Sequence, residues 1–209
     1  MPRYSKTIAL AITGASGIAY ALRLLECLVA AKVRVYLMIS RPGQMVIGLE
    51  SNLKLPGRAA EIQRFLTERF HAAHGQMEVF GQDQWTAPVA SGSGAPDAMA
   101  ICPCTTGTLA AVACGASRSL LERAADVMLK EHRKLILVVR ETPLSEIHLQ
   151  NMLTLARMGA VIMPANPGFY HRPQQIEGLV DFIVARVLDH MGIEHTLLPR
   201  WGVDAEDPA

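Results

Sequence analysis

The sequence predicts an α/β fold in which a doubly wound parallel sheet lies between two layers of helices, a three-layer αβα sandwich. Short apolar runs alternate with amphipathic segments along the whole chain, without repeats or low-complexity linkers. The apolar runs are hydrophobic at every position rather than at every second one, which is typical of strands buried on both faces. The length of 209 residues fits one domain, so we expect a single domain over residues 1–209 with a C-terminal tail at about 200–209.

The strands are predicted at the short apolar runs. They cover, in order, residues 7–13, 33–39, 98–102, 134–139 and 161–163. The third begins a long uncharged stretch, 98–117, which contains Pro103 and several threonines and glycines. This composition suits a buried strand, loop and helix better than a helix in lipid.

The helices are predicted from the spacing of apolar residues between the strands. They cover residues 18–31, 42–50, 58–73, 119–132, 145–158 and 176–191. The last has the clearest i, i+3, i+4, i+7 pattern, and Pro173 precedes it at a place where a first turn tolerates proline. Strands and helices in this alternation are typical of Rossmann-like and flavodoxin-like domains.

Charge excludes one class of partner and suggests another. Twenty basic and nineteen acidic residues give a formal net charge of +1, which removes the electrostatic case for a nucleic-acid partner. Charged residues make up 19% of the chain, below the roughly 25% of ordinary soluble domains. We therefore expect part of the surface to be covered by other copies of the chain.

The lack of a recognisable targeting signal and the setting of the cysteines lead us to expect a cytoplasmic protein. The first apolar run, 8–12, is too short for a signal-peptide core, and no segment reads as a membrane span. The four cysteines, Cys27, Cys102, Cys104 and Cys114, stand in apolar or Gly-rich surroundings and are expected to be small buried residues in a reducing compartment. The Cys-Pro-Cys spacing lacks the two-residue spacer of zinc and redox motifs.

Polar residues gather directly after the predicted strands. In strand order they are Gly14 and Ser16; Ser40; Thr105, Thr106 and Thr108; Arg140 and Glu141; and, after residues 164–168, Tyr170. Ligands of open parallel sheets bind outside the carboxyl ends of the strands. Hydroxyls, an arginine and a Gly-rich turn that opens a helix suit a phosphorylated ligand.

The ligand does not resemble a dinucleotide. The turn Gly14-x-x-Gly17 is not a full G-x-G-x-x-G fingerprint, and the second strand ends in Ser40-Arg41 rather than in an acid for a ribose hydroxyl. Arg41 leaves an NADP interpretation open. A mononucleotide with one phosphate, such as FMN, fits the hydroxyl-rich strand ends better.

Other charged residues have two interpretations from spacing alone. Arg123 and Lys130 are seven residues apart on one helix and project from the same side, either as a solvated edge or as an anion-binding pair. Arg186 lies at the margin of the last apolar stripe and Glu50 follows a helix pattern. Residues 91–94, Ser-Gly-Ser-Gly, are either a linker or a loop folded over a ligand.

These residues occur in strings that resemble the flavin prenyltransferases of the UbiX type, over about residues 7–201. The strings are Thr-Gly-Ala-Ser-Gly from residue 13, Ser-Gly-Ser from 91, Cys-Pro-Cys-Thr-Thr from 102, Arg-Ala-Ala-Asp-Val from 123, Arg-Glu-Thr-Pro-Leu from 140 and Pro-Gly-Phe-Tyr-His-Arg-Pro-Gln from 167. Thr105 departs from the serine common in the family but keeps the hydroxyl. The family attaches a dimethylallyl group to reduced FMN and forms dodecamers.

The resemblance implies a role for each candidate residue. It implies that FMN is held by Gly14, Ala15, Ser16, Ser40, Thr105, Thr106, Gly107, Thr108 and Arg140. It places around the prenyl phosphate Ser91, Gly92, Arg123, Lys130, Glu141, Tyr170 and Arg186. Aromatic faces for a developing allyl cation are Trp85, Tyr170 and Trp201. The catalytic set is Glu50, Glu141, Ser16, Lys130 and Tyr170.

The implied chemistry matches these residue types. Phosphate leaves readily only when its charge is neutralised, which clustered Arg and Lys side chains do. Two protons must leave the flavin, from N5 and C6, and Glu50 and Glu141 are the expected acid/base pair. The sequence lacks an Asp-rich pair that would hold magnesium, so we expect no metal and dimethylallyl monophosphate as donor. The product would serve a separate UbiD-type decarboxylase in ubiquinone biosynthesis.

Two other functions remain open from the sequence. An FMN-dependent cysteine-type decarboxylase shares the fold and flavin site, but Lys130, Tyr170 and Arg186 have no role in its chemistry. A flavin carrier without catalysis would keep Gly14, Ser16 and Arg140 and would need neither glutamate.

Overall fold

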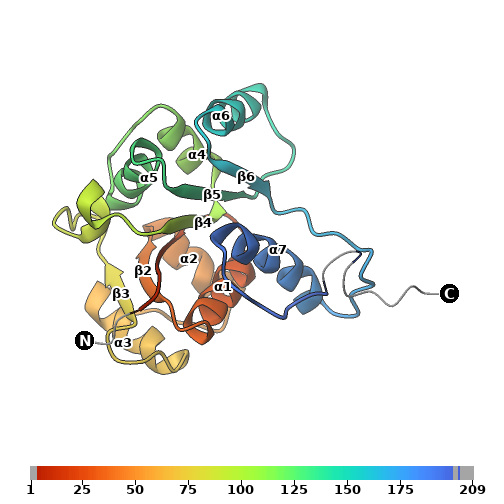
Figure 1. Cartoon of the computed structure of the whole chain (residues 1–209), viewed down its shortest axis with the longest axis horizontal. Coiled ribbons are helices and arrows are strands. Elements are labelled where there is room, and N and C mark those ends of the chain that lie inside the picture. The colour runs from red at the N-terminus through yellow and green to blue at the C-terminus, as the bar shows by residue number, and fades with distance from the viewer. Residues whose placement is uncertain (1–3, 200–201, 203–209) are drawn as a thin grey trace.

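The sheet of the computed structural model, which describes residues 4–199 and 202, is parallel throughout (Figure 1). It has six strands in the order β3-β2-β1-β4-β5-β6. Their bounds are β1 Thr7–Ile12, β2 Arg34–Ile39, β3 Met77–Phe80, β4 Ala98–Cys104, β5 Lys134–Val139 and β6 Val161–Pro164. The chain passes from β1 outward to β3, then returns to β4 beside β1, so the direction of winding reverses between β1 and β4.

Helices cover both faces of the sheet. Their bounds are α1 Ile18–Ala30, α2 Arg41–Glu50, α3 Ala59–Arg69, α4 Thr106–Ala113, α5 Leu120–Lys130, α6 Glu146–Arg157 and α7 Ile176–Met191. One core joins residues of α1, α2, α3 and α7 to one face of β1, and a second core joins α4, α5 and α6 to its other face. The predicted α/β sandwich is therefore confirmed as a single doubly wound domain.

The structure adds one strand to those that the sequence predicts. Residues 77–80 form an edge strand, β3, that the sequence did not indicate. Only four residues long, it carries Glu78, which is paired with Arg34 of β2 at 3.0 Å between Oε2 and Nη2. A strand this short and partly polar has no long apolar run to identify it.

The cysteines are only partly as expected. Cys102 and Cys104 are buried in β4 and Cys27 is half-buried, but Cys114 is exposed because it follows the last turn of α4. All four are free thiols. Burial raises the pKa of Cys102 and raises that of Cys104 to about 12, so neither thiol is a ready nucleophile or metal ligand.

No helix within residues 4–199 is long and apolar enough to cross a membrane. Most of the tail that we placed at about 200–209 lies outside the described residues.

Candidate functional site

Four neighbouring strand ends form one edge, which we call the strand-end site. Ser40, Thr13, Thr105 and Arg140 directly follow β2, β1, β4 and β5, which are adjacent in that order. Backbone hydrogen bonds hold the ends in line: the Ser40 amide donates to Ile12 O at 3.0 Å, and the Arg140 amide donates to Cys104 O at 3.3 Å. The site includes the point between β1 and β4 where open α/β sheets bind ligands.

Thr13 joins the two turns at this point. It is 2% exposed. Its Oγ1 donates to the carbonyl of Pro103 at 2.6 Å and accepts from the Thr105 amide at 2.9 Å. One buried hydroxyl therefore holds the turn after β1 against the turn after β4. We did not single out Thr13 from the sequence, although a polar residue at the end of an apolar strand was a usable signal.

The start of α4 is arranged to bind an anion. Thr105 is its N-cap, and Thr105 Oγ1 accepts from the Thr108 amide at 3.1 Å and lies 2.9 Å from Thr108 Oγ1. The next amides, of Thr106 and Gly107, belong to the first turn, where amides have no partner within the helix. Such amides and the helix dipole favour phosphate. At the same edge of the sheet, Ser40 caps α2 and accepts from the Gly43 amide at 3.0 Å.

The turn after β1 is closely packed. A Cβ on Gly14 would overlap the Cβ of Pro42, so only glycine lets the turn lie against the start of α2. Gly17 has a φ of 104°, which favours glycine. Ala15 is buried and Ser16 is exposed. The turn thus presents backbone and the Ser16 hydroxyl at the edge of the sheet.

Glu50, the last residue of α2, lies at the start of α1. Its Oε2 accepts from the amides of Gly17 and Ile18 at 2.8 and 3.0 Å. Burial raises the pKa of Glu50, but hydrogen bonds from the Ser16 side chain and these amides, with the charge of Arg140, outweigh it and lower the pKa. An ionised carboxylate therefore occupies the helix start that the sequence suggested for a ligand phosphate, which leaves α4 as the better phosphate site.

Arg140 and Glu141 complete the strand-end site. Arg140 is half-buried, and its Nε is buried without a hydrogen-bond partner among the described residues. A buried donor of this kind calls for an acceptor. Glu141 Oε1 accepts from the neighbouring Thr142 amide at 3.1 Å. The unpaired Arg140 donor, the α4 amides and the hydroxyls fit a phosphorylated ligand that carries further acceptors, as FMN does.

A second group of predicted residues lies together on and beside α5. We call Ser91, Gly92, Arg123 and Lys130 the α5 patch. Arg123 Nε donates to Ala90 O at 3.1 Å, and a Cβ on Gly92 would overlap the Glu131 carboxylate that pairs with Lys130. The loop of residues 91–94 therefore packs against α5, and Ser91 Oγ lies 3.2 Å from Ser93 Oγ.

Lys130, at the end of α5, is away from the strand-end site of the same chain. Lys130 ends α5 and is followed within four residues by Lys134, the first residue of β5. Lys130 thus lies at the amino end of the sheet, opposite the edge where Arg140 follows β5. One chain therefore does not bring Lys130 to the strand-end site.

The remaining predicted residues are also dispersed. Arg186 lies on α7, across the sheet from α5, and its Nη1 contacts Asp189 Oδ2 at 2.7 Å. Tyr170, 60% exposed, lies between β6 and α7, and Trp85, 47% exposed, lies between β3 and β4. Trp201 lies outside the described residues.

The sequence also missed the acids that pair with the predicted cations. Asp126 Oδ2 is 2.6 Å from Arg123 Nη1, and Glu131 pairs with Lys130. The i, i+3 spacing of Arg123 and Asp126 was a signal for the first pair. Among the residues that the structure describes, no three or more His, Cys, Asp or Glu side chains group as metal ligands.

Comparisons with known proteins concern the family and the fold of the chain. Residues 2–188 match the Flavoprotein family. The chain is 59% identical over 195 residues to "Flavin prenyltransferase UbiX" of Pseudomonas aeruginosa, with 93% of each chain covered. Among solved structures it is similar to AnUbiX in complex with FMN and dimethylallyl pyrophosphate, with a TM-score of 0.83, 38% identity and coverage of 94% and 97%.

Two further structures bear on assembly and on the alternatives. A dodecameric FMN-dependent UbiX-like decarboxylase from Escherichia coli O157:H7 is 38% identical, with a TM-score of 0.81 and coverage of 93% and 98%. The FMN-dependent cysteine decarboxylase TvaF is 15% identical with a TM-score of 0.58 over 90% of this chain and 99% of its own. The second likeness shows the fold alone.

Proposed function

The chain belongs to the flavin prenyltransferases of the UbiX type, which are transferases, and we propose that it joins a dimethylallyl group from dimethylallyl monophosphate to N5 and C6 of reduced FMN. The observation that carries this proposal is the strand-end site. There, an anion-binding helix start, an unpaired buried Arg140 donor and the ionised Glu50 occupy one edge.

The strand-end site would hold FMN. The start of α4, from Thr105 to Thr108, with Ser40 would bind the phosphate, and the turn from Gly14 to Ser16 would contact the rest of the flavin. Arg140 Nε would donate to an acceptor on the ligand. Bound reduced FMN would supply two nucleophilic atoms, N5 and C6, and the prenyl donor would supply the allyl carbons and the leaving phosphate; binding, charge stabilisation and proton transfer would come from the protein.

Glu50 and Glu141 are the proposed acid/base pair. Glu50 is held ionised by the Gly17 and Ile18 amides and by Ser16, so it can accept a proton released at the flavin. The Ser16 hydroxyl orients that carboxylate. Glu141 follows Arg140 on the same edge, in reach of a donor bound beside the flavin.

The donor phosphate would be bound by the α5 patch of a neighbouring copy, together with Arg186, Glu141 and Tyr170. Lys130 is exposed, and its ion pair with Glu131 lies on the surface. A surface ion pair contributes little to the free energy of folding, so Lys130 can bind a phosphate instead. Arg and Lys on the leaving phosphate stabilise its developing charge. Trp85 and Trp201 are proposed aromatic neighbours of the allyl group. A dodecamer would supply such neighbouring copies.

A second part of the proposal concerns the enzyme that uses the product. We propose that prenylated FMN passes to a separate UbiD-type decarboxylase of ubiquinone biosynthesis, in the cytoplasm. Four free cysteines suit a reducing compartment. Adding the extracted product to a flavin-free UbiD-type decarboxylase tests the transfer, and restored decarboxylation is the expected result.

The test of the activity is a mass measurement on the flavin. The purified protein is incubated anaerobically with reduced FMN and dimethylallyl monophosphate without metal, and the flavin is extracted and weighed. A gain of one dimethylallyl unit is expected, and the Arg140→Ala variant should give neither bound nor modified flavin. Modification only with the diphosphate and magnesium would overturn the proposed donor. Tightly bound but unmodified flavin under both conditions would favour the carrier function.

A further inference from the structure

Two aromatic rings of the loop between β6 and α7 pack against a third on α7. The rings of His171 and Phe182 are stacked, with centroids 5.6 Å apart and an interplanar angle of 11°. The Tyr170 ring meets both edge-on, at 6.0 Å from His171 and 5.7 Å from Phe182. These are favourable geometries for ring pairs. We call the three rings the Tyr170 cluster.

Glycine at position 168 makes this packing possible. A Cβ on Gly168 would lie 2.8 Å from Tyr170 Cε1 and 3.0 Å from two atoms of the Phe182 ring. Real Cβ atoms do not come so close, so any side chain there would displace Tyr170 or Phe182. The loop therefore has the sequence needed to hold Tyr170 against Phe182.

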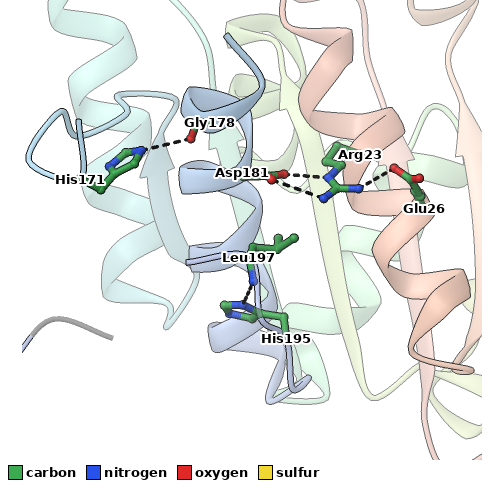
Figure 2. Close-up of polar contacts among 7 residues, drawn as sticks. All are labelled: Arg23, Glu26, His171, Gly178, Asp181, His195 and Leu197. Atoms are coloured by element: carbon green, nitrogen blue, oxygen red, sulfur yellow. Dashed lines mark hydrogen bonds and ion pairs between the residues drawn. The ribbon is translucent and has the colours of Figure 1, made fainter. Parts of the chain in front are cut away.

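A hydrogen bond determines how His171 is oriented. Its Nε2 lies 3.3 Å from the carbonyl oxygen of Gly178 in the first turn of α7 (Figure 2). A carbonyl only accepts, so Nε2 carries the proton. The imidazole is thereby tied to the helix that carries its stacking partner, Phe182.

Helix α7, which supports the cluster, is joined to α1, the helix whose start binds the Glu50 carboxylate. Arg23 of α1 donates from Nε to Asp181 Oδ1 at 2.7 Å and from Nη2 to Oδ2 at 3.3 Å (Figure 2). Asp181 precedes Phe182 directly, and α1 begins with Ile18, whose amide binds Glu50. The Arg23–Asp181 pair thus holds α7, which carries Phe182, against α1, whose first amide binds Glu50.

We propose that His171 and Phe182 are positioning residues that hold the Tyr170 ring in place for the prenyl donor. Phe182 packs against the core, whereas Tyr170 is 60% exposed. One end of the cluster is therefore fixed by the fold and the other is presented outward. The inference rests on the proposed function, in which Tyr170 contacts the donor.

A double-mutant cycle tests whether Phe182 acts through Tyr170. Phe182→Leu removes the ring and keeps an apolar side chain, and we expect kcat for prenyl transfer to fall about tenfold, the size of one good ring pair, with the Kd for FMN unchanged. In the Tyr170→Ala background the same change should have no further effect. Phe169→Leu, the same substitution on an exposed ring outside the cluster, is the matched control and should behave as wild type.

His171 is tested by comparing two substitutions in the same activity assay. His171→Phe keeps a flat ring and should retain more activity than His171→Ala, because the stack survives although the bond to Gly178 is lost. Additive effects of Phe182→Leu and Tyr170→Ala would overturn the proposal, and so would full activity in Tyr170→Ala combined with a loss in Phe182→Leu.

A measurement without turnover separates this inference from the proposed function. The protein is labelled with 3-fluorotyrosine, and the ¹⁹F resonance of Tyr170 is assigned from the Tyr170→Phe variant. Phe182→Leu should move that resonance toward the value of a solvated tyrosine, whether or not the enzyme prenylates FMN. An unmoved resonance would overturn the inference even if prenyl transfer is demonstrated.

Discussion

The strand-end site and the α5 patch contain the same kinds of polar side chain but are assembled in different ways. At the strand-end site, Thr13, Thr105 and Arg140 follow neighbouring strands and are brought together by strand pairing. In the α5 patch, Arg123 and Lys130 lie on a helix, and each pairs with a nearby acid, Asp126 or Glu131. The first site contains a buried donor with no partner among the residues that the structure describes, whereas the second presents cations that already have partners.

This difference shows which part of the site one chain completes. Parallel pairing aligns the ends of adjacent strands whatever surrounds the protein, so the strand-end site needs no other copy. A helix that packs antiparallel to the strands carries its last residue to the opposite edge, which is where Lys130 lies. We therefore propose that Lys130 reaches a strand-end site only where another copy of the chain brings it there.

The largest effect is expected at the strand-end site, from Glu50→Gln. The amide keeps an acceptor for the Gly17 and Ile18 amides but cannot accept a proton. We expect kcat for prenyl transfer to fall by about 100-fold or more, while FMN binding measured by flavin fluorescence stays nearly unchanged. Full transfer in this variant would remove Glu50 from the chemistry.

Mixing two inactive variants tests whether one site combines residues from two copies of the chain. Arg140→Ala damages the strand-end site, and Lys130→Glu damages the α5 patch. If a site combines two copies, equal co-expression with random assembly should leave about a quarter of the sites intact, measured as recovered prenyl transfer. If each chain completed its own site, every chain would carry a defect and the mixture would stay inactive.

A smaller effect is expected from Lys130→Ala in the α5 patch. Loss of one charge-assisted hydrogen bond to the donor should raise KM for dimethylallyl monophosphate about tenfold. The Kd for FMN should not change, because Lys130 is away from the strand-end site. Loss of FMN binding instead would indicate a structural role for Lys130.

The smallest effect concerns acid stability. The pKa of Glu50 is lowered in the folded chain, so its ionised form stabilises the fold above its ordinary pKa, and that contribution disappears as pH falls through the lowered value. The free energy of unfolding, measured in urea, should fall more steeply on the acid side for wild type than for Glu50→Gln. Parallel profiles below about pH 4.5 would contradict the assigned environment of Glu50.

Most of the strand-end site could be predicted from the sequence because its signals are local. An apolar run followed by Gly, Ser, Thr or Arg identifies both a strand and its end, and Gly14, Ser40, Thr105 and Arg140 were found in this way. The edge strand β3 was missed because four residues carry too little pattern. The place of Glu50 was missed because its partners, Gly17 and Ile18, are more than thirty residues away in the chain.

The sequence by itself determined the fold class, the apolar strands and most of the residues that follow them, since periodicity and turn chemistry act between near neighbours. Only the tertiary structure decided that Glu50 occupies the start of α1, that Thr13 joins two turns and that Lys130 lies at the opposite edge from Arg140. These placements depend on the order of strands in the sheet and on the direction in which helices pack across it. Both are settled by long-range contacts between segments that no local pattern connects.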